Sequence, residues 1–463
     1  MRRLSVMFGL VLAVAQGLCA ELDLDLPTND GFIGFNAKER RFTAAVESSP
    51  LKKVMAKLGT ATGWKVYIDP GAQRTVSAQF TNRTSGEALR MLLGGLNFAL
   101  VPQEGGPSKL LVFQNSAKDA TEFVEPTKAK AVSKDRIPNE LVVSLSRNSK
   151  RDIESLARSL GAKIVGRNDK LRSYRLQFDS EDAANNARNQ LASAPDVRVD
   201  DNYYVHTPDP GFQLAGGPPE FNLTPDVNPD ACHPIVAVVD TAVQPLRADK
   251  SAFLLPSIDI SGTTSAAKLA NSTPLHGTSM VETILGSMAV TAKDQQTSGV
   301  KILPVNVYGD SDTTSTYEVT MGVYEAVKKG ATIVNMSLGG DGDSPLLDDL
   351  IAQARARGVL FFAAAGNAPT TSPTYPAANP NVFAVTAGDQ AGNVAEYANR
   401  GDFIDFIAPG TSYMDFDGQT FRVVGTSPAT AIVSGAAATF ASDCLGQDAM
   451  MQRIQQTFGY QRK

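Results

Sequence analysis

Continuous apolar runs separated by helical patterns dominate the second half of the chain, residues 233–463. The runs include HPIVAVVD, VKILPVNV, ATIVNMSL, VLFFAAA and VFAVTAG, and patterns such as STYEVTMGVYEAVKKG and PLLDDLIAQARARG lie between them. Strands that are apolar on both faces suit a parallel sheet that helices cover on both sides. We therefore expect an α/β domain built on a doubly wound, mostly parallel sheet.

Two shorter blocks precede this domain, residues 21–117 and 136–206, and each carries the pattern strand-helix-strand-strand-helix-strand. Residues 118–135 are rich in Lys, Glu, Ala and Thr without apolar periodicity, and residues 207–232 are rich in Pro and Gly. Both compositions are typical of linkers. The sequence therefore predicts two small α+β domains in front of the α/β domain.

Local signals place the helices of the two small blocks. In the first block, apolar residues recur at helical spacing after Pro50, and Thr84 with Glu87 forms a capping-box pattern before a second helix. In the second block, Ser149 is the predicted cap of a helix that ends at Gly161.

The composition excludes several classes of function. Lys and Arg number 43 against 48 Asp and Glu, a formal net charge of -5, so a nucleic-acid partner is not expected. With three His and three Cys in 463 residues, zinc clusters are excluded, and we predict no metal site and no cofactor. His206 and His233 lie outside segments that could form a catalytic site.

Residues 1–20 have the layout of a secretory signal peptide: two arginines, the apolar stretch 6–15 and then small residues. Cleavage is predicted near Ala20, with Gly17 also allowed, and lipid attachment at Cys19 is a weaker alternative. The apolar stretch is too short for a transmembrane helix, and nothing later is long enough to span a bilayer. We therefore expect an exported, soluble mature protein.

Four polar residues stand where chemistry is possible in the last block. Asp240 ends the first apolar strand, and Asn367 follows another. His276 and Ser427 each stand where a helix begins. A Ser hydroxyl becomes a nucleophile when His takes its proton and Asp orients the His, and Asp, His, Ser is one of the recurring chain orders of such a triad.

Six segments of the last block resemble the signature segments of the subtilisin-like serine proteases, in that family's order. They are VVDTAV, HGTSMVETI, NMSLGG, FFAAAGN, IAPG and GTSPATAIVSGAAA. The resemblance implies a subtilisin-like fold and a catalytic triad with a side-chain oxyanion donor. The residues concerned are Asp240, His276 and Ser427 for the triad and Asn367 for the oxyanion.

The same resemblance implies that a peptide substrate lies as an added strand along SLGG, so that the substrate-binding residues are Ser337, Leu338 and Gly339. The expected pocket walls, residues 363–366 and the YPAA segment from Tyr375, are small and apolar. They favour a moderately hydrophobic side chain before the cleaved bond.

Two positions and one stretch depart from the family pattern. Ala242 stands where the family commonly has Gly, and it would strain the turn if that position needs a positive φ. Pro428 replaces a bulky apolar residue and suits a first helical position. In the stretch GSMAVTAKDQQTSG, Asp294 is the only hard anionic ligand, so a strong calcium site is not supported.

Cys232 and Cys444 remain after the signal peptide is removed. Cys232 precedes the strand of Asp240, and Cys444 follows the helix of Ser427, so both lie on the side of the sheet opposite the site. A disulfide is sterically possible there in an oxidising compartment, and two buried free thiols are the alternative. The sequence leaves both open.

The small blocks acquire roles by resemblance. PNELVVSLSRNSKRDIESLARSLGAKIVG resembles a subtilase prosegment, which would be cleaved off between about Tyr203 and Pro218. SSPLKKVMAKLGTATGWKVYIDPGAQ and FTNRTSGEALRMLLGGLNFALVP resemble the short N-terminal domain of secretins and TonB-dependent receptors. In those families this domain contacts other proteins, which implies a Gram-negative envelope and an envelope protein partner.

Two hypotheses follow. The first is an exported, periplasmic or secreted, subtilisin-like serine endopeptidase that is made as a zymogen, processes itself and acts on proteins or peptides. The second is a catalytically weak or inactive subtilase fold that serves as an envelope interaction module. Ala242 is the only sequence support for the second hypothesis.

Overall fold

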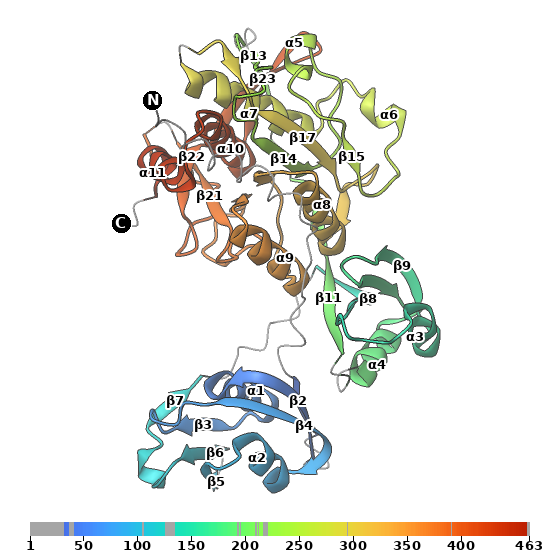
Figure 1. Cartoon of the computed structure of the whole chain (residues 1–463), viewed down its shortest axis with the longest axis vertical. Helices are drawn as coiled ribbons and strands as arrows, with labels where there is room; N and C mark the ends of the chain where they lie inside the picture. Colours follow the sequence, from blue (N-terminus) through green and yellow to red (C-terminus); the bar gives the residue numbers. More distant parts are fainter. Residues whose placement is uncertain are drawn as a thin grey trace, which may run out of the picture. The chain divides into compact units, whose positions relative to one another are not determined.

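The structure is a computed structural model that describes residues 32–36, 41–103, 106–125, 135–191, 194, 196–208, 211, 213–215, 221–293, 295–389 and 391–460 (Figure 1). The predicted signal peptide, Asp294 and part of the predicted cleavage region lie outside these residues. The described chain forms two compact units. One contains residues 135–136 and 202–460, and the other contains residues 32–125 and 137–201.

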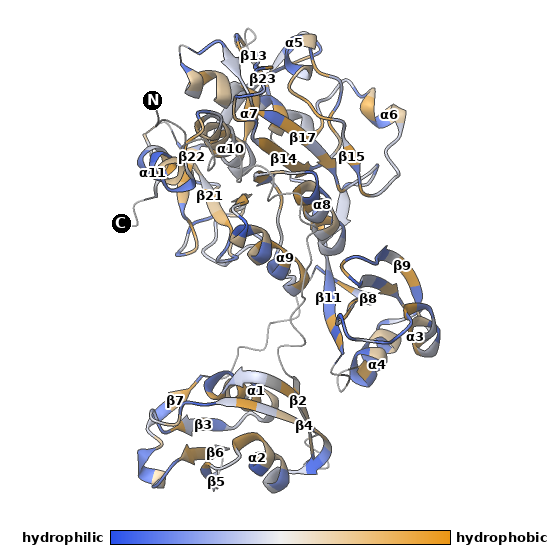
Figure 2. Cartoon of the chain, viewed as in Figure 1, coloured by the Kyte–Doolittle hydropathy of each residue, from blue (hydrophilic) through white to orange (hydrophobic). Residues whose placement is uncertain are grey.

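A seven-stranded parallel sheet lies at the centre of the first unit, with strand order β15-β17-β14-β19-β20-β21-β22. Figure 2 shows that β14 and β17 are rich in hydrophobic residues. The predicted doubly wound α/β domain is thereby confirmed. The strands are Ile235–Asp240 (β14), Ile258–Asp259 (β15), Lys301–Asn306 (β17), Ile333–Met336 (β19), Leu360–Ala364 (β20), Phe383–Gly388 (β21) and Phe406–Pro409 (β22).

Helices cover both faces of this sheet because its strands are apolar on both. Val236 and Val238 of β14 belong to a core shared with α7 and α10. Val239 points to the other face, where it approaches Gly322 of α8. The helices are Ala248–Ser251 (α5), Ala266–Leu269 (α6), His276–Ala292 (α7), Thr316–Lys328 (α8), Pro345–Ala356 (α9), Thr426–Ser442 (α10) and Gln447–Phe458 (α11).

Short strands at the border of the sheet complete the first unit. A three-stranded antiparallel sheet has the order β12-β24-β23, and β13 pairs with β16. The strands are Gln213–Ala215 (β12), Thr224–Pro225 (β13), Thr297–Ser298 (β16), Thr313–Ser315 (β18), Thr411–Phe416 (β23) and Gln419–Val424 (β24).

Residues 136–206 follow the predicted order of elements. They are Arg136–Leu145 (β8), Ile153–Leu160 (α3), Lys163–Asn168 (β9), Ser173–Gln177 (β10), Glu181–Leu191 (α4) and Val197–His206 (β11). One cap was predicted wrongly. Asp152 caps α3 by accepting from Ser155 N at 2.8 Å, whereas Ser149 donates its hydroxyl to Asp196 at 2.6 Å.

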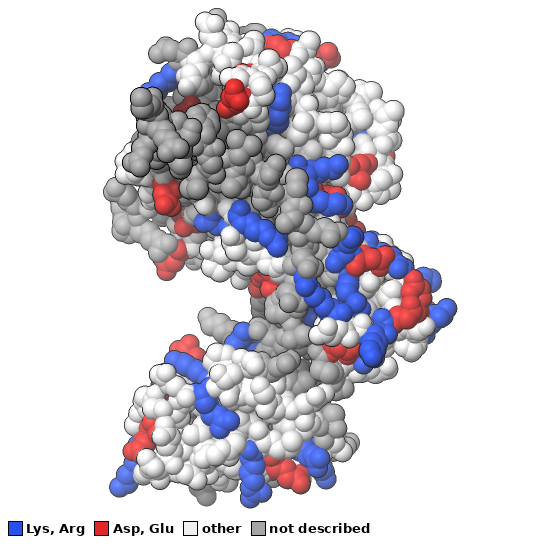
Figure 3. Space-filling model, in the orientation of Figure 1, with Lys and Arg blue, Asp and Glu red and all other residues white. Residues whose placement is uncertain are grey.

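Ion pairs cover the surface of this block, and Figure 3 shows acidic and basic side chains next to one another on it. Arg167 lies between Glu154 and Asp169, and these two carboxylates raise the pKa of the Arg167 guanidinium. Exposed pairs of this kind contribute little to stability. They give the block a mixed surface charge.

Residues 32–125 form a separate hydrophobic core with more strands than predicted. The predicted helices and the capping box of Thr84 and Glu87 are present. Three strands, β1, β5 and β7, were not predicted. Strand β7 lies within the predicted linker 118–135 but belongs to this block, because it pairs with β3. The elements are Phe32–Asn36 (β1), Arg41–Pro50 (β2), Leu51–Thr62 (α1), Lys65–Ile68 (β3), Thr75–Thr84 (β4), Ser85–Leu93 (α2), Asn97–Gln103 (β5), Gly106–Phe113 (β6), Ala117–Asp119 (η1) and Glu122–Val124 (β7).

A disulfide joins Cys232 to Cys444, with 5.4 Å between the Cα atoms and 212 residues between the two positions. It links the segment before β14 to the segment after α10. Of the two alternatives that the sequence leaves open, the structure contains the bridge.

Replacing both cysteines, as Cys232→Ser with Cys444→Ser, should destabilise the first unit. Constraining so long a loop in the unfolded chain stabilises a protein by up to about 5 kcal/mol. We expect a clearly lower thermal midpoint for the double variant in calorimetry of the full chain. Dithiothreitol should lower the midpoint of the wild type in the same way and leave that of the variant unchanged. Equal midpoints of oxidised wild type and variant would contradict a stabilising bridge.

Candidate active site

Asp240 and His276 form a buried pair at the carboxyl end of the central sheet. Asp240 is the last residue of β14, and His276 is the first residue of α7. The Nδ1 atom of His276 lies 2.7 and 2.9 Å from the two carboxylate oxygens of Asp240, and both side chains are 1% exposed. Such a contact keeps the proton on Nδ1, so that Nε2 can accept one.

The turn after Asp240 packs directly on the start of α7. Thr241 accepts a hydrogen bond from Gly277 N at 2.8 Å through its hydroxyl. A Cβ atom on Gly277 would lie 2.2 Å from the carbonyl oxygen of Thr241. Gln244 adds two more contacts, because its backbone N donates to the Thr278 hydroxyl and its side-chain oxygen accepts from Leu275 N. These contacts fix the helix relative to the strand.

Ala242 is buried and does not have a positive φ: the described non-glycine residues in that region of conformational space are Ser48, Asn82, Arg172, Lys293, Asp417 and Cys444. The turn therefore does not need Gly at this position. The strain that the sequence suggested for Ala242 is not present.

Ser427 is the second residue of α10, after Gly425 and Thr426. Pro428 is therefore the third helical residue and not the first, but it is still in the turn where backbone N–H groups lack intrahelical partners. The hydroxyl of Ser427 donates to the carbonyl oxygen of Ser337 at 3.2 Å. Within the described part of the chain, the buried Nε2 of His276 has no hydrogen-bond partner.

Neighbouring strands hold the two sides of this arrangement. In the parallel pair of β14 and β19, Val238 lies opposite Asn335. Two residues further along each chain, Asp240 ends β14 and Ser337 directly follows β19. Asp240 binds His276, and Ser337 binds Ser427. The Ser427 hydroxyl thus faces the Ser337 carbonyl in this structure, and hydroxyl-imidazole contacts of catalytic sites are often open in free enzymes.

A buried chain of hydrogen bonds connects the middle of α10 through β19 to the backbone carbonyl of Ser427. Ser434 of α10 donates to Asn335 Oδ1 at 3.0 Å, and Asn335 Nδ2 donates to the Ser337 hydroxyl at 3.0 Å. That hydroxyl donates to the carbonyl oxygen of Ser427 at 3.1 Å. Asn335 and Ser434 were not predicted as site residues, although a polar residue inside the apolar run IVNMSL was a usable signal.

Asn367 lies beyond the end of β20 and is exposed. Its Oδ1 atom accepts from Thr426 N at 2.9 Å and from the Thr426 hydroxyl at 3.0 Å. With the acceptor end of the amide held in this way, Nδ2 is the end that a ligand at Ser427 can use. Together with the backbone N–H of Ser427 near the start of α10, it can stabilise a developing oxyanion.

Residues 203–208, 211 and 213–215, which we call the crossing segment, contact strands on both sides of this site. Tyr204–His206 pair antiparallel with β18, and Thr207 N donates to Asp312 O at 2.9 Å. Further along, β12 pairs with β24, whose last residue is three positions before Ser427. The chain is thus bound to a strand edge before the site and again after it.

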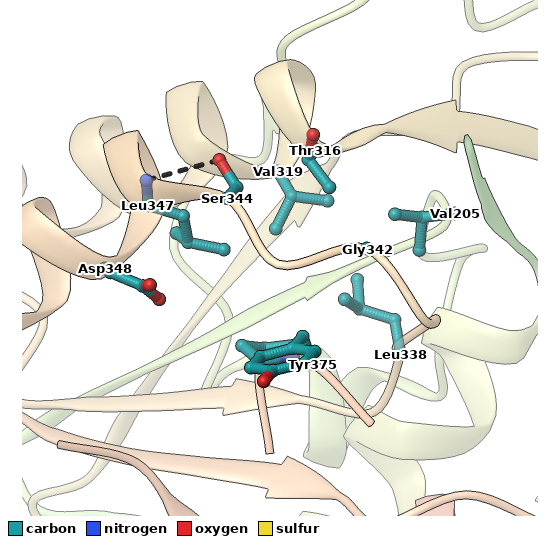
Figure 4. A pocket seen from close by; sticks show the side chains of 10 residues that line it. Val205, Thr316, Val319, Leu338, Gly342, Ser344, Leu347, Asp348 and Tyr375 are labelled. Atoms are coloured by element: carbon teal, nitrogen blue, oxygen red, sulfur yellow. Dashed lines mark hydrogen bonds between the residues drawn. The ribbon is translucent and has the colours of Figure 1, made fainter. Parts of the chain in front are cut away.

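Within this segment, the side chain of Val205 lines a cavity (Figure 4). The opposite walls include Val319, Leu338 and Tyr375. Next to it, Tyr203 packs against Gly342, where a Cβ atom would lie 2.2 Å from the Tyr203 ring. The crossing segment is therefore held by backbone pairing, by the buried side chains of Tyr203 and Val205, and by side-chain hydrogen bonds of Thr207 and Gln213.

The three predicted substrate-binding residues have different surroundings. Ser337 is fully buried and bonded to Ser427, and Leu338 lines the cavity of Val205. Gly339 packs against Tyr375: a Cβ atom added to Gly339 would lie 3.0 Å from the Tyr375 carbonyl oxygen. The next residue, Gly340, exchanges backbone hydrogen bonds with Tyr375.

The predicted pocket walls at residues 363–366 are small and mostly buried. Asn399 supports them by donating to Ala365 O at 2.8 Å. Burial, together with the charges of Asp343 and Asp348, raises the pKa of the Tyr375 hydroxyl, so that this wall stays neutral. The ring of His233 lies elsewhere, bonded to the carbonyls of Gly299 and Asn228.

Within the described ranges, no group of three His, Cys, Asp or Glu residues could hold a metal ion. In the same ranges no helix has the length and apolar character that crossing a membrane requires.

Two family models match the chain. Residues 233–457 match the Subtilase family, and residues 124–199 match the Fervidolysin N-terminal prodomain. The first match covers all four predicted catalytic residues, and the second covers most of the second small block. The resemblance of residues 21–117 to the N-terminal domain of secretins and TonB-dependent receptors stays a prediction.

Known proteins agree with these matches. The chain is 32% identical over 213 residues to Thermitase from Thermoactinomyces vulgaris, which is 45% of this chain and 74% of Thermitase. It is 37% identical over 140 residues to Subtilisin Savinase from Lederbergia lenta, which is 30% of this chain and about half, 52%, of Savinase. Fervidolysin from Fervidobacterium pennivorans has the same fold, with a TM-score of 0.50 at 21% identity over 66% of this chain and 55% of fervidolysin.

Gly277→Ala should disturb the site where Gly286→Ala in the same helix does not. The Cβ of the first variant would meet the Thr241 carbonyl at 2.2 Å, whereas nothing lies within 4 Å of a Cβ at Gly286. We expect Gly277→Ala to lower the free energy of unfolding by about 1–3 kcal/mol through overpacking. Gly286→Ala should raise it by up to about 1 kcal/mol through helix propensity.

Chemical denaturation of the two variants and the wild type measures this difference. Equal stability of the two alanine variants would show that the turn of Thr241 can move away from α7 without cost.

Proposed function

Because the chain belongs to the subtilase family, we propose that it is an exported serine endopeptidase made as a zymogen. Asp240, His276 and Ser427 are the catalytic triad, and Asn367 is the side-chain oxyanion donor. The observation that carries the proposal is the buried pair of His276 and Asp240. The second ring nitrogen of His276, Nε2, is buried and has no hydrogen-bond partner among the described residues. Such a nitrogen needs a partner, and a rotated Ser427 hydroxyl supplies it.

The reaction follows from these positions. Ser427 turns from Ser337 to His276, gives its proton to Nε2 and attacks the peptide carbonyl. The oxyanion forms between Asn367 Nδ2 and the backbone N–H of Ser427. His276 then protonates the leaving amine, and a water molecule activated in the same way releases the acyl group. Asp240 stabilises the His276 imidazolium each time it forms and holds the neutral ring in place between these steps.

The substrate lies as an added strand in the place where the crossing segment now lies. This segment pairs with β18 and approaches Gly340 and Gly342, next to the predicted residues Ser337, Leu338 and Gly339. The small walls at residues 363–366 favour a moderately hydrophobic side chain before the cleaved bond.

The prodomain match and the crossing segment support self-processing. The contact with the β18 side extends to Thr207, whose N donates to Asp312 O. The contact with β24 begins at Gly211, where an added Cβ would lie 3.9 Å from the Cβ of Val424. The cleaved bond therefore falls between Thr207 and Gly211, within the region predicted from the sequence. Export through the signal peptide, a periplasmic or secreted location in a Gram-negative bacterium and an envelope partner for residues 21–117 remain parts of this proposal.

The alternative function, an inactive interaction module, rested on strain at Ala242. The φ angle of Ala242 is not positive, so this support is gone. Labelling of the wild type by a fluorophosphonate probe separates the two functions, because only an activated Ser427 reacts.

Ser427→Ala should abolish self-processing. The purified variant is expected to stay full length, whereas the wild type should yield a mature form whose first residue, located by mass spectrometry, lies between Pro208 and Gly211. Ser442→Ala, at the other end of α10, is the matched control and should be processed like the wild type. Normal self-processing of Ser427→Ala would refute the triad.

Asn367→Ala should lower kcat by about 10²–10³-fold, the magnitude that loss of the equivalent donor has in a subtilisin. KM should change little, because the donor acts on the oxyanion of the transition state. Asn367→Asp keeps the acceptor for Thr426 but loses the donor, so its kcat should fall as well. An active Asn367→Asp enzyme would show that Asn367 acts only by positioning Thr426.

A further inference from the structure

Tyr308 lies between the candidate active site and the crossing segment. It follows β17, is 3% exposed, and donates its hydroxyl to the backbone carbonyl of His206 at 3.2 Å. Its backbone is fixed, because Tyr308 N donates to Asn306 Oδ1 at 3.0 Å and Val307 N donates to Asp240 O at 3.0 Å. These bonds fix the backbone of Tyr308 next to the strand of Asp240, and burial confines its side chain.

The carbonyl that Tyr308 binds is one that β18 does not satisfy. Backbone groups of successive strand residues point to opposite sides, and Thr207 N points to Asp312 O on the β18 side. Tyr204 N and the groups of His206 therefore point away from β18, and Tyr204 N donates to Asp135 O. Without Tyr308, the His206 carbonyl would lose this hydrogen bond.

The contact does not depend on the side chain at position 206. The imidazole of His206 is 63% exposed, at 3.8 Å from Asp135, whereas its backbone carbonyl faces a buried hydroxyl. Burial and the negative charge of Asp240 raise the pKa of Tyr308 well above its usual value, so that the hydroxyl remains a donor.

We propose that Tyr308 is a substrate-binding residue, whose hydroxyl binds the main-chain carbonyl of a peptide lying along β18, whatever its side chains. In the precursor the crossing segment occupies this position, and after processing a substrate or product peptide does. The inference rests on the proposed protease function and adds a side-chain donor to its peptide-binding groove. Tyr308 acts on binding and not on the bond that is broken.

The test uses processed wild type, Tyr308→Phe and the control Tyr324→Phe. Tyr324 is a buried tyrosine of α8, and Lys328 Nζ lies 5.7 Å from the centre of its ring. The probe is the synthetic peptide of residues 202–208, used as a competitive inhibitor of casein cleavage. A second version carries a thioamide, a weaker acceptor, in place of the His206 carbonyl.

We expect Tyr308→Phe to weaken inhibition by the unmodified peptide about 3- to 10-fold, the effect of one hydrogen bond. The thioamide should weaken inhibition of the wild type and of Tyr324→Phe, but it should cause no further loss in Tyr308→Phe. Labelling of Ser427 by a small fluorophosphonate measures the amount of active enzyme in each of the three preparations, and inhibition is compared at equal amounts of labelled enzyme. Equal inhibition of wild type and Tyr308→Phe, or no inhibition of the wild type, would overturn the proposal.

A second measurement covers the case in which Tyr308→Phe does not mature. In the uncleaved Ser427→Ala precursor, the amides of residues 204–207 should exchange with deuterium about 3- to 10-fold faster when Tyr308→Phe is added. Unchanged exchange would contradict the contact. If the wild type itself is not labelled by fluorophosphonate, the protease function fails, while the exchange result still decides whether Tyr308 binds the segment.

Discussion

The paired hydrogen bonds between Asp240 and His276 are the contact on which the rest of the site depends. A carboxylate that is 1% exposed is costly unless its oxygens are bonded, and those of Asp240 accept from His276 and from Thr241 N. This need determines the surroundings. Helix α7 must begin at the end of β14, Gly277 must lack a side chain, and Gln244 must hold the residues on both sides of His276.

The neighbouring strand solves the same problem with neutral groups. Asn335 lies in a fully buried strand, where an unbonded amide would cost about 1–3 kcal/mol. Its two ends bind Ser434 and Ser337, and Ser337 passes the connection to the backbone of Ser427. The start of α10 is therefore tied to β19 as the start of α7 is tied to β14, and the register of two adjacent strands sets the spacing of the His and the Ser.

The sequence predicted five of the seven strands, β14, β17, β19, β20 and β21, and the helices α7, α8, α9 and α10, with the four candidate residues at strand ends and helix starts. Buried parallel strands give long apolar runs, and their polar ends stand out. The short strands β15 and β22 and the helices α5, α6 and α11 were not predicted. It did not predict Tyr308, because a Tyr after an apolar strand has the pattern of an ordinary core residue and its partner is a backbone carbonyl 102 positions earlier. The cap of α3 was misplaced for a related reason: Ser149 and Asp152 are both suitable caps, and only the tertiary contact of Ser149 with Asp196 decides between them. The strand β7 escaped prediction because it consists of three residues in a polar context.

The crossing segment is bound in a way that suits a temporary occupant of the groove. Its contacts with β18, β24 and Tyr308 go mainly through the backbone, with one side-chain hydrogen bond from Arg422 of β24 to Gln213. Leu214 is 72% exposed although its strand is paired. Val205 is the one side chain of the segment that lines the described cavity. Backbone pairing is available to any extended peptide, so a substrate can replace the segment without reproducing its sequence. On the proposed self-processing, the same backbone geometry would allow one groove to accept both the precursor and unrelated peptides.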